Sequence, residues 1–158
     1  MATVYSDVRT DLTQHDTPEF VKASTLAGEV RVARAQYEAS SLASGDVIEM
    51  FALPQGARIL MGYLAHDALG SSTTLSVGHA AYTNSAGTSV AADPDEFKAA
   101  AASTSAQRVD IAATLALGMG AEVDLDQDLK DNEYIVTVTM GGAAGTGTIE
   151  VMMMYVVN

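Results

Sequence analysis

The fold class is decided by residues 133–157, which read EYIVTVTM-GGAAGTG-TIEVMMMYVV. β-branched and aromatic residues dominate the two outer parts, and glycine dominates the part between them. Side chains on both faces of each outer part are largely apolar or β-branched, which is typical of strands packed inside a sandwich or barrel. We therefore predict two strands, 133–140 and 148–157, joined as a hairpin by a wide glycine-rich turn.

Five further segments of strand character precede this region, at 28–38, 46–53, 58–68, 73–78 and 107–117. Turn residues separate them, such as Ser44-Gly45-Asp46 and Pro54-Gln55-Gly56-Ala57. Segment 46–53 is apolar on both faces, so we expect it to be a central strand. Regularly spaced strands with little helix predict an all-β fold, an antiparallel β-sandwich or barrel.

One short helix is expected to start at Asp93. Asp93, Pro94 and Glu96 occupy the positions of an N-cap, a first helical residue and a capping-box glutamate. The alanines of segment 99–102 continue the pattern, because alanine has the highest helix propensity. So short a helix needs Phe97 packed on the core to be stable.

The chain of 158 residues has the length of one domain. Residues 1–25 are polar and keep no period, so we predict an N-terminal arm over 1–25 and a single β-sandwich domain over 26–158. Five apolar residues are interspersed in the arm and are candidates for contact with a neighbouring subunit: Val4, Tyr5, Val8, Leu12 and Phe20. A frayed terminus is the alternative interpretation of the same segment.

Composition excludes several classes of protein. The chain has no cysteine, so disulfides, thiolate catalysis and cysteine-ligated metals are ruled out. Its net charge is −12 and its few bases are scattered, which argues against direct nucleic-acid binding. The longest apolar run is 151–157, too short to span a membrane, and the start lacks the features of a signal peptide. We expect synthesis in the cytoplasm and no membrane partner.

No catalytic arrangement is apparent. The histidines are His15, His66 and His79, and His66 and Asp67 are neighbours on a predicted strand, where adjacent side chains point to opposite faces. There is no G-x-S-x-G motif, and the glycines at 141–147 lie between two strands rather than between a strand and a helix. We expect no enzyme activity and no cofactor.

The only candidate metal ligands are Asp124, Asp126 and Asp128, which alternate along the chain. Carboxylates at this spacing are able to surround Ca²⁺. The EF-hand pattern fails, since Leu129 takes the place of its glycine and Ile135 the place of its bidentate glutamate. A solvated acidic loop is the favoured interpretation, and a calcium site is the alternative.

Four stretches occur in a familiar order: VRVARAQY at 30–37, LASGDVI at 42–48, ALPQGARIL at 52–60 and STTLSVG at 72–78. A segment with aspartate and an aromatic residue follows at 93–97, then the terminal strand pair. Over residues 28–100 and this pair, the chain resembles small virion structural proteins of tailed bacteriophages, the capsid cement or decoration proteins. The resemblance implies a jelly-roll-like β-sandwich that binds the major capsid protein at the capsid surface, often as a trimer, with no catalytic residues.

Three functions remain open on this basis. The leading hypothesis is a capsid cement or decoration protein. The apolar strand faces favour a homo-oligomer, and a homotrimer would suit a capsid three-fold axis. A tail or head-completion module is an alternative, favoured by a long hairpin with a wide turn. A calcium- or carbohydrate-binding β-sandwich module is another.

Met152, Met153 and Met154 alternate faces on a strand, so at most two share a face, and core filling or subunit contact is favoured over ligand capture.

Overall fold

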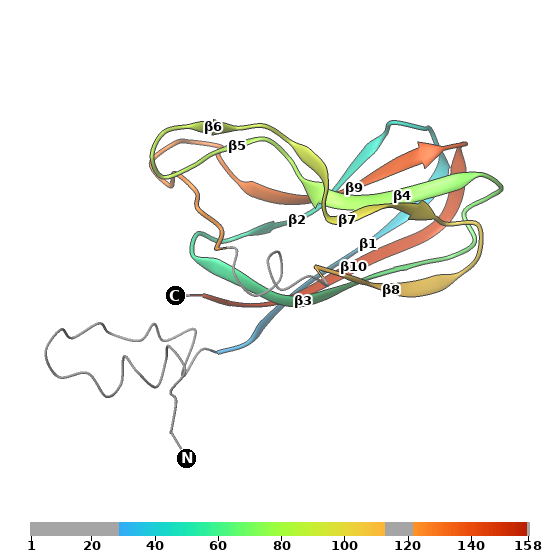
Figure 1. The fold of residues 1–158 in the computed structure, drawn as a ribbon, viewed down its shortest axis with the longest axis horizontal. Helices are drawn as coiled ribbons and strands as arrows, with labels where there is room; N and C mark the ends of the chain where they lie inside the picture. Colours follow the sequence, from blue (N-terminus) through green and yellow to red (C-terminus); the bar gives the residue numbers. More distant parts are fainter. Residues whose placement is uncertain (1–28, 113–121, 158) are drawn as a thin grey trace, which may run out of the picture.

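The computed structural model describes residues 29–112 and 122–157. Ten antiparallel strands make two four-stranded sheets and one small two-stranded sheet (Figure 1). Sheet A has the order β1-β10-β3-β8, and sheet B has the order β2-β9-β4-β7. The bounds in sheet A are Arg31–Leu42 (β1), Gly145–Val157 (β10), Ala57–His66 (β3) and Gln107–Ile111 (β8). Those in sheet B are Val47–Leu53 (β2), Tyr134–Gly142 (β9), Thr73–His79 (β4) and Asp93–Ala102 (β7). Tyr82–Thr83 (β5) pairs with Ser89–Val90 (β6).

The pairing of the eight long strands is nested. β1 pairs with β10, β2 with β9, β3 with β8 and β4 with β7, so the first four strands meet the last four in reverse order. Successive pairs fall in alternate sheets, and the two sheets face each other. This is the topology of a jelly roll. The prediction of an all-β, jelly-roll-like antiparallel sandwich is confirmed.

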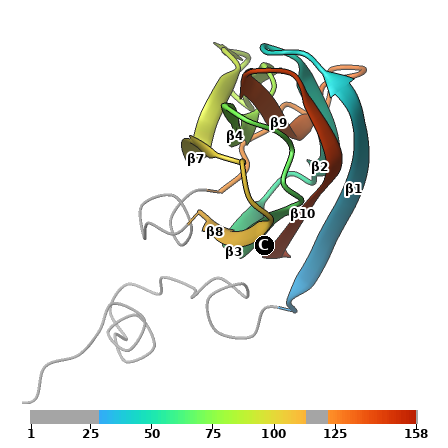
Figure 2. The same cartoon turned by 90° about the vertical axis from the view of Figure 1, so that its right-hand side faces the viewer.

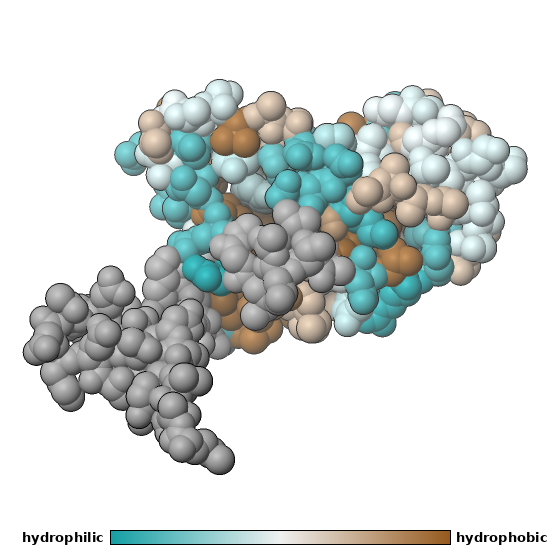
Figure 3. Space-filling model, in the orientation of Figure 1, coloured by the Kyte–Doolittle hydropathy of each residue, from teal (hydrophilic) through white to brown (hydrophobic). Residues whose placement is uncertain are grey.

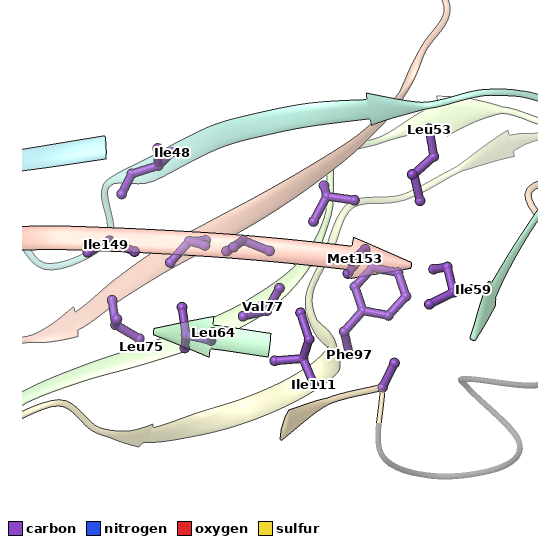
Figure 4. Packing of buried hydrophobic residues seen from close by; sticks show 14 of the residues in the cluster. Ile48, Leu53, Ile59, Leu64, Leu75, Val77, Phe97, Ile111, Ile149 and Met153 are labelled. Atoms are coloured by element: carbon purple, nitrogen blue, oxygen red, sulfur yellow. The ribbon is translucent and has the colours of Figure 1, made fainter. Parts of the chain in front are cut away.

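The core lies between the two sheets (Figure 4). Strand alternation supplies it, because every second residue of an inner strand points inward. Ile149, Val151 and Met153 of β10 are fully buried, as are Val136 and Val138 of β9. Apolar side chains from both sheets thus fill one continuous interior, and their burial is the main source of stability.

The short helix predicted at Asp93 is wrong, because residues 93–102 form strand β7 at the edge of sheet B. The Asp93 carboxylate does accept a hydrogen bond from the Asp95 amide at 3.1 Å, as a capping residue does, but no helix follows. Pairing with β4 and burial of Phe97, which is 5% exposed, outweigh the helix propensity of the alanines. The part of the chain that the structure describes contains no helix.

The predicted terminal hairpin is also wrong. β9 belongs to sheet B and β10 to sheet A, and the chain crosses from one sheet to the other at Ala143 and Ala144. Both segments are strands, as predicted, but each pairs with other strands.

Segment 46–53 was expected to be central and is instead the edge strand β2 of sheet B. A register irregularity between Glu49 and Phe51 explains the misleading apolar pattern, because it breaks the alternation of faces.

The predicted arm, residues 1–25 with its five apolar residues, lies outside the described residues. The described chain begins at Glu29, directly before β1. In Figure 2, β1 runs along one side of the sandwich, at the edge of sheet A. The end of the segment predicted at 107–117 is outside the described range as well, and its first part is β8.

Candidate functional site

Strand β10 places two methionines on the outside of the sandwich. Val151 and Met153 are fully buried between the sheets. Met152 and Met154 alternate with them and therefore point to the opposite, outward face of sheet A. The methionine run thus divides as expected from its alternation, with one side chain in the core and two outside.

The neighbouring strands extend this apolar row. Met154 lies opposite Val32 on β1 and Met61 on β3, and Met152 lies opposite Tyr63 on β3. Cross-strand partners share a face and touch. Val32 is 56% exposed and Met61 is 46% exposed, so the row is open to solvent. We call these five residues, Val32, Met61, Tyr63, Met152 and Met154, the methionine face. Figure 3 shows hydrophobic atoms at the lower edge of the molecule, outside sheet A.

Charged residues of both signs lie beside the methionine face, since Asp110 of β8 lies opposite Tyr63 in the strand register. The Arg108 guanidinium lies 3.8 Å from the centroid of the Tyr63 ring, a cation–π contact. Arg34 forms an ion pair with Glu150, which lowers the pKa of that carboxyl and raises the pKa of the exposed guanidinium. The Tyr63 hydroxyl donates a long hydrogen bond to the Met61 sulfur at 3.9 Å. The face is therefore apolar at its centre and charged at its rim.

Charge is divided unequally over the molecule. Four of the six arginine and lysine residues in the described ranges lie on sheet A strands, together with only three acids. The other 13 of the 16 acids in those ranges lie elsewhere, with two lysines. The bases on sheet A are Arg31, Arg34, Arg58 and Arg108, and the acids are Glu38, Asp110 and Glu150. Sheet A is thus slightly positive, whereas the remainder of the described chain is strongly negative.

The outward side of sheet B is chemically different. Thr139 lies opposite Ser76 and Thr137 opposite Gly78 across β9 and β4, while Val136 and Val138 between them point inward. Small hydroxyl-bearing residues and glycine thus take the places that methionine and tyrosine hold on sheet A. The two faces of the sandwich are not equivalent, and the methionine face is the apolar one.

A cleft of about 480 Å³ opens beside three aromatic rings. The ring centroids of His79, Tyr82 and Tyr134 lie 4.9–5.4 Å apart, and Asp93 and Glu96 line the same cleft. Burial raises the pKa of Tyr134 far above its usual range, with smaller contributions from Tyr82 and the two acids. Burial likewise raises the pKa of Tyr82. Both phenols therefore stay protonated at neutral pH and act only as hydrogen-bonding, apolar surfaces.

Neither described histidine is paired with a carboxylate. The Nδ1 atom of His66 lies 2.7 Å from the Asp67 backbone oxygen, and that of His79 lies 2.8 Å from the Ala80 backbone oxygen. The Asp67 carboxylate instead accepts a hydrogen bond from the Thr148 amide at 3.0 Å. In the described ranges, therefore, no histidine–aspartate pair of the kind used by hydrolases is assembled around these two rings. The absence of enzyme activity stays a prediction.

Of the three aspartates singled out as candidate metal ligands, Asp124 and Asp126 have carboxylates that accept hydrogen bonds from backbone amides. Asp124 accepts a hydrogen bond from the Ser85 amide at 3.4 Å, and Asp126 accepts one from the Asp128 amide at 3.0 Å. Within residues 29–112 and 122–157, no group of three or more histidine, aspartate or glutamate side chains is arranged to hold a metal ion. These residues also include no helix long and apolar enough to cross a membrane.

Met61 and Tyr63 were missed as candidate site residues by sequence reasoning. They stand in segment 58–68, whose apolar residues on both sides gave no reason to prefer an outward face. The signal becomes visible only with the register, which sets both opposite the outward methionines of β10. The predicted contact residues of the arm lie outside the described residues and are not compared with this face.

Chains in several solved phage capsid structures have a similar fold. One in the cyanophage Pam1 capsid asymmetric unit superposes with a TM-score of 0.60 and 15% identity, over 92% of this chain and 97% of that one. One in the capsid of Ralstonia phage GP4 gives 0.58 and 24%, over 89% and 92%. One in the acid-stable capsid of Helicobacter pylori bacteriophage KHP30 gives 0.51 and 14%, over 81% and 87%.

At these identities the similarity is one of fold. No protein-family model matches the sequence, and no curated protein matches it.

Proposed function

We propose that this chain is a structural protein of a tailed-phage virion, which stabilises the capsid as a cement or decoration protein. In this proposal it is made in the host cytoplasm and binds the major capsid protein at the capsid surface as a homotrimer. It carries no catalytic residues and no cofactor, and it binds neither nucleic acid nor membrane.

One observation carries the proposal. The jelly roll is shared with chains of three phage capsid structures, and the match covers most of both chains in every case. Those chains are therefore about as long as this one, so the likeness is to whole small capsid components rather than to one domain of a large protein. The order of the motifs at residues 30–78 resembles that of cement and decoration proteins, and it supports the proposal independently of the fold.

The alternatives lose their particular support. A tail or head-completion ring was favoured by a terminal hairpin, and β9 and β10 do not pair with each other. A calcium-binding module was favoured by three aspartates, and in the described ranges these do not gather with other acids as ligands of one ion. These two findings do not weaken the cement hypothesis. A cement protein requires a surface that binds the shell, and it requires neither a terminal hairpin nor a metal site.

The N-terminal arm has a place in this proposal. A fully extended chain of 25 residues spans at most about 90 Å. That reach would let the apolar residues Val4, Tyr5, Val8, Leu12 and Phe20 contact a neighbouring subunit or the shell. Many modest contacts of this kind, repeated over a capsid, add up through avidity.

The test is a phage from which this gene has been deleted. We expect particles without the protein to assemble but to release their DNA at a lower temperature than wild-type particles, because the shell loses its lateral ties. Adding the purified protein to the deficient particles should restore the release temperature. Deficient particles that are as heat-resistant as wild-type particles, or that fail to bind added protein, would contradict the proposal.

A further inference from the structure

The outward face of sheet A changes in character along its length. Partners in the strand register form rows across the sheet, and the row nearest the start of β1 is wholly apolar: Val32, Met154 and Met61. The next row is mixed and consists of Arg34, Met152, Tyr63 and Asp110. The row after it is mostly polar and consists of Gln36, Glu150, Ala65 and Arg108. The apolar end of the methionine face is therefore the end at which the described chain begins.

This apolar end is open to solvent. Val32 is 56% exposed, Met61 is 46% exposed, and Val30, which directly precedes β1, is 53% exposed. A contiguous apolar patch with a polar border marks an interaction site. Methionine suits such a site because its flexible side chain adapts to an occupant.

Charge does not select the occupant. Arg34 is paired with Glu150, and Asp110 stands in the same row as Tyr63. The border of the face therefore carries both signs. The occupant is identified instead by its apolar character and by its access to this end of the sheet.

The preceding segment of the chain has that access. The structure describes the chain from Glu29, three residues before Val32, and residues 1–28 come before it. Phe20 and Val21 are an adjacent apolar pair in this segment, nine and eight residues from Glu29. Eight residues of extended chain span at most about 29 Å. Met61 is only about 15 Å from Glu29, since Val32 lies about 10 Å along the chain and Met61 two strand spacings of about 4.8 Å across the sheet.

A tether of this length favours the chain's own face over the face of another copy. A short flexible linker holds its two ends at an effective concentration in the millimolar range, with which dilute free copies compete poorly. Docking of Phe20 and Val21 also removes apolar surface from water on both sides of the contact. Both effects favour a contact within one chain.

We propose that the arm folds back in the free protein, so that Phe20 and Val21 cover the apolar row Val32, Met154 and Met61 of the same chain. This contact goes beyond the proposed function, because it forms within a single copy and without a capsid. An arm that binds a neighbouring subunit or the shell then has to leave the methionine face first.

Oxidation of Met61 by hydrogen peroxide measures whether the row is covered. Peroxide converts an accessible methionine to its sulfoxide, and the chain has no cysteine to compete for it. Tryptic peptides 59–98 and 35–58 contain Met61 and Met50 as their only methionines, so mass spectrometry follows the two separately. Met50 lies on β2 of sheet B and serves as the internal reference.

The full chain is compared with three variants. The serine variant, Phe20→Ser with Val21→Ser, removes the apolar pair. The matched control is Thr17→Ser with Thr25→Ser, which changes polar residues on either side of the pair. The conservative variant, Phe20→Leu with Val21→Ile, keeps the pair apolar. Circular dichroism checks that each protein is folded.

We expect Met61 to be oxidised about tenfold faster in the serine variant than in the wild type, as for an arm docked in about nine-tenths of the molecules. The matched control and the conservative variant should protect Met61 as the wild type does, and Met50 should react at one rate in all four proteins. An increase of less than about twofold in the serine variant, or an equal loss of protection in the matched control, would overturn the proposal.

Dilution distinguishes the chain's own arm from the arm of another copy. Protection within one chain is independent of protein concentration, whereas protection by another copy falls on dilution. We therefore expect Met61 of the wild type to react at the same rate at high and low concentration, and a rate that rises on dilution would contradict the proposal. No capsid takes part in these measurements, so their failure leaves capsid binding to be judged by the gene deletion.

Discussion

Glycine 142 shows how much a single residue contributes to the crossing between the two sheets. It ends β9 with φ of +75°, a conformation that glycine adopts without strain. A Cβ atom at this position would lie 2.0 Å from the Ser72 backbone oxygen. Gly87 has nearly the same φ, +74°, but a Cβ atom there would meet nothing within 4 Å. The two positions therefore separate backbone strain from steric overlap.

Alanine substitutions at these positions test that separation. Gly87→Ala should lower the free energy of unfolding by about 1–2 kcal/mol, the cost of a left-handed conformation for a residue with a Cβ atom. Gly142→Ala should cost clearly more, because the Ser72 backbone must also move. The measurement is denaturant-induced unfolding of both variants beside the wild type. Equal costs at the two positions would show that the crossing is not as tight as described.

At the scale of elements, sequence reasoning located strands well and their partners poorly. Segments predicted at 58–68 and 73–78 correspond to β3 (Ala57–His66) and β4 (Thr73–His79), because apolar alternation is a local property. The partners of β9 and β10 and the edge position of β2 depend on contacts between distant parts of the chain. A local sequence pattern holds no information on contacts between distant segments. The predictions of a terminal hairpin and of a central strand at 46–53 were wrong for this reason.

The methionine face illustrates the same limit for the candidate site. The run Met152–Met154 was recognised as alternating, and a strand requires that alternation. Which two methionines lie outside, and which residues of β1 and β3 join them, follow from the register alone. A search by residue type singled out Asp124, Asp126 and Asp128 as the alternative site instead, since acidic side chains stand out in a sequence and outward apolar ones do not.

Strand β7 offers a test of the competition between local propensity and pairing. Ala100 is exposed on this edge strand, so its side chain has little packing to lose. Ala100→Thr should leave the free energy of unfolding unchanged or raise it by up to about 1 kcal/mol, because β-branched residues favour strands. In a helix the same change would lower it by roughly 0.5–0.7 kcal/mol. Thermal and denaturant unfolding distinguish the two, and a loss of the second size would contradict the assignment of residues 93–102 as a strand.

At the scale of the whole molecule, the division of charge and apolar surface fits a protein made to be packed against others. Acids dominate the loops and sheet B, which keeps the free protein soluble through net negative charge. The apolar side chains left outside the core include Val32 and Met61 on sheet A and Leu129 in the loop between β8 and β9. The amino-acid composition was informative about this general character, but only the fold shows that Val32 and Met61 belong to one apolar face.

The central claim is that this jelly roll is a repeated structural part of a capsid, and its copy number in the particle tests this most directly. Quantitative mass spectrometry of purified virions, with the major capsid protein as internal reference, gives that number. We predict a number of copies comparable with that of the major capsid protein, as a protein that ties shell subunits together requires. A handful of copies per particle, or none, would contradict the account.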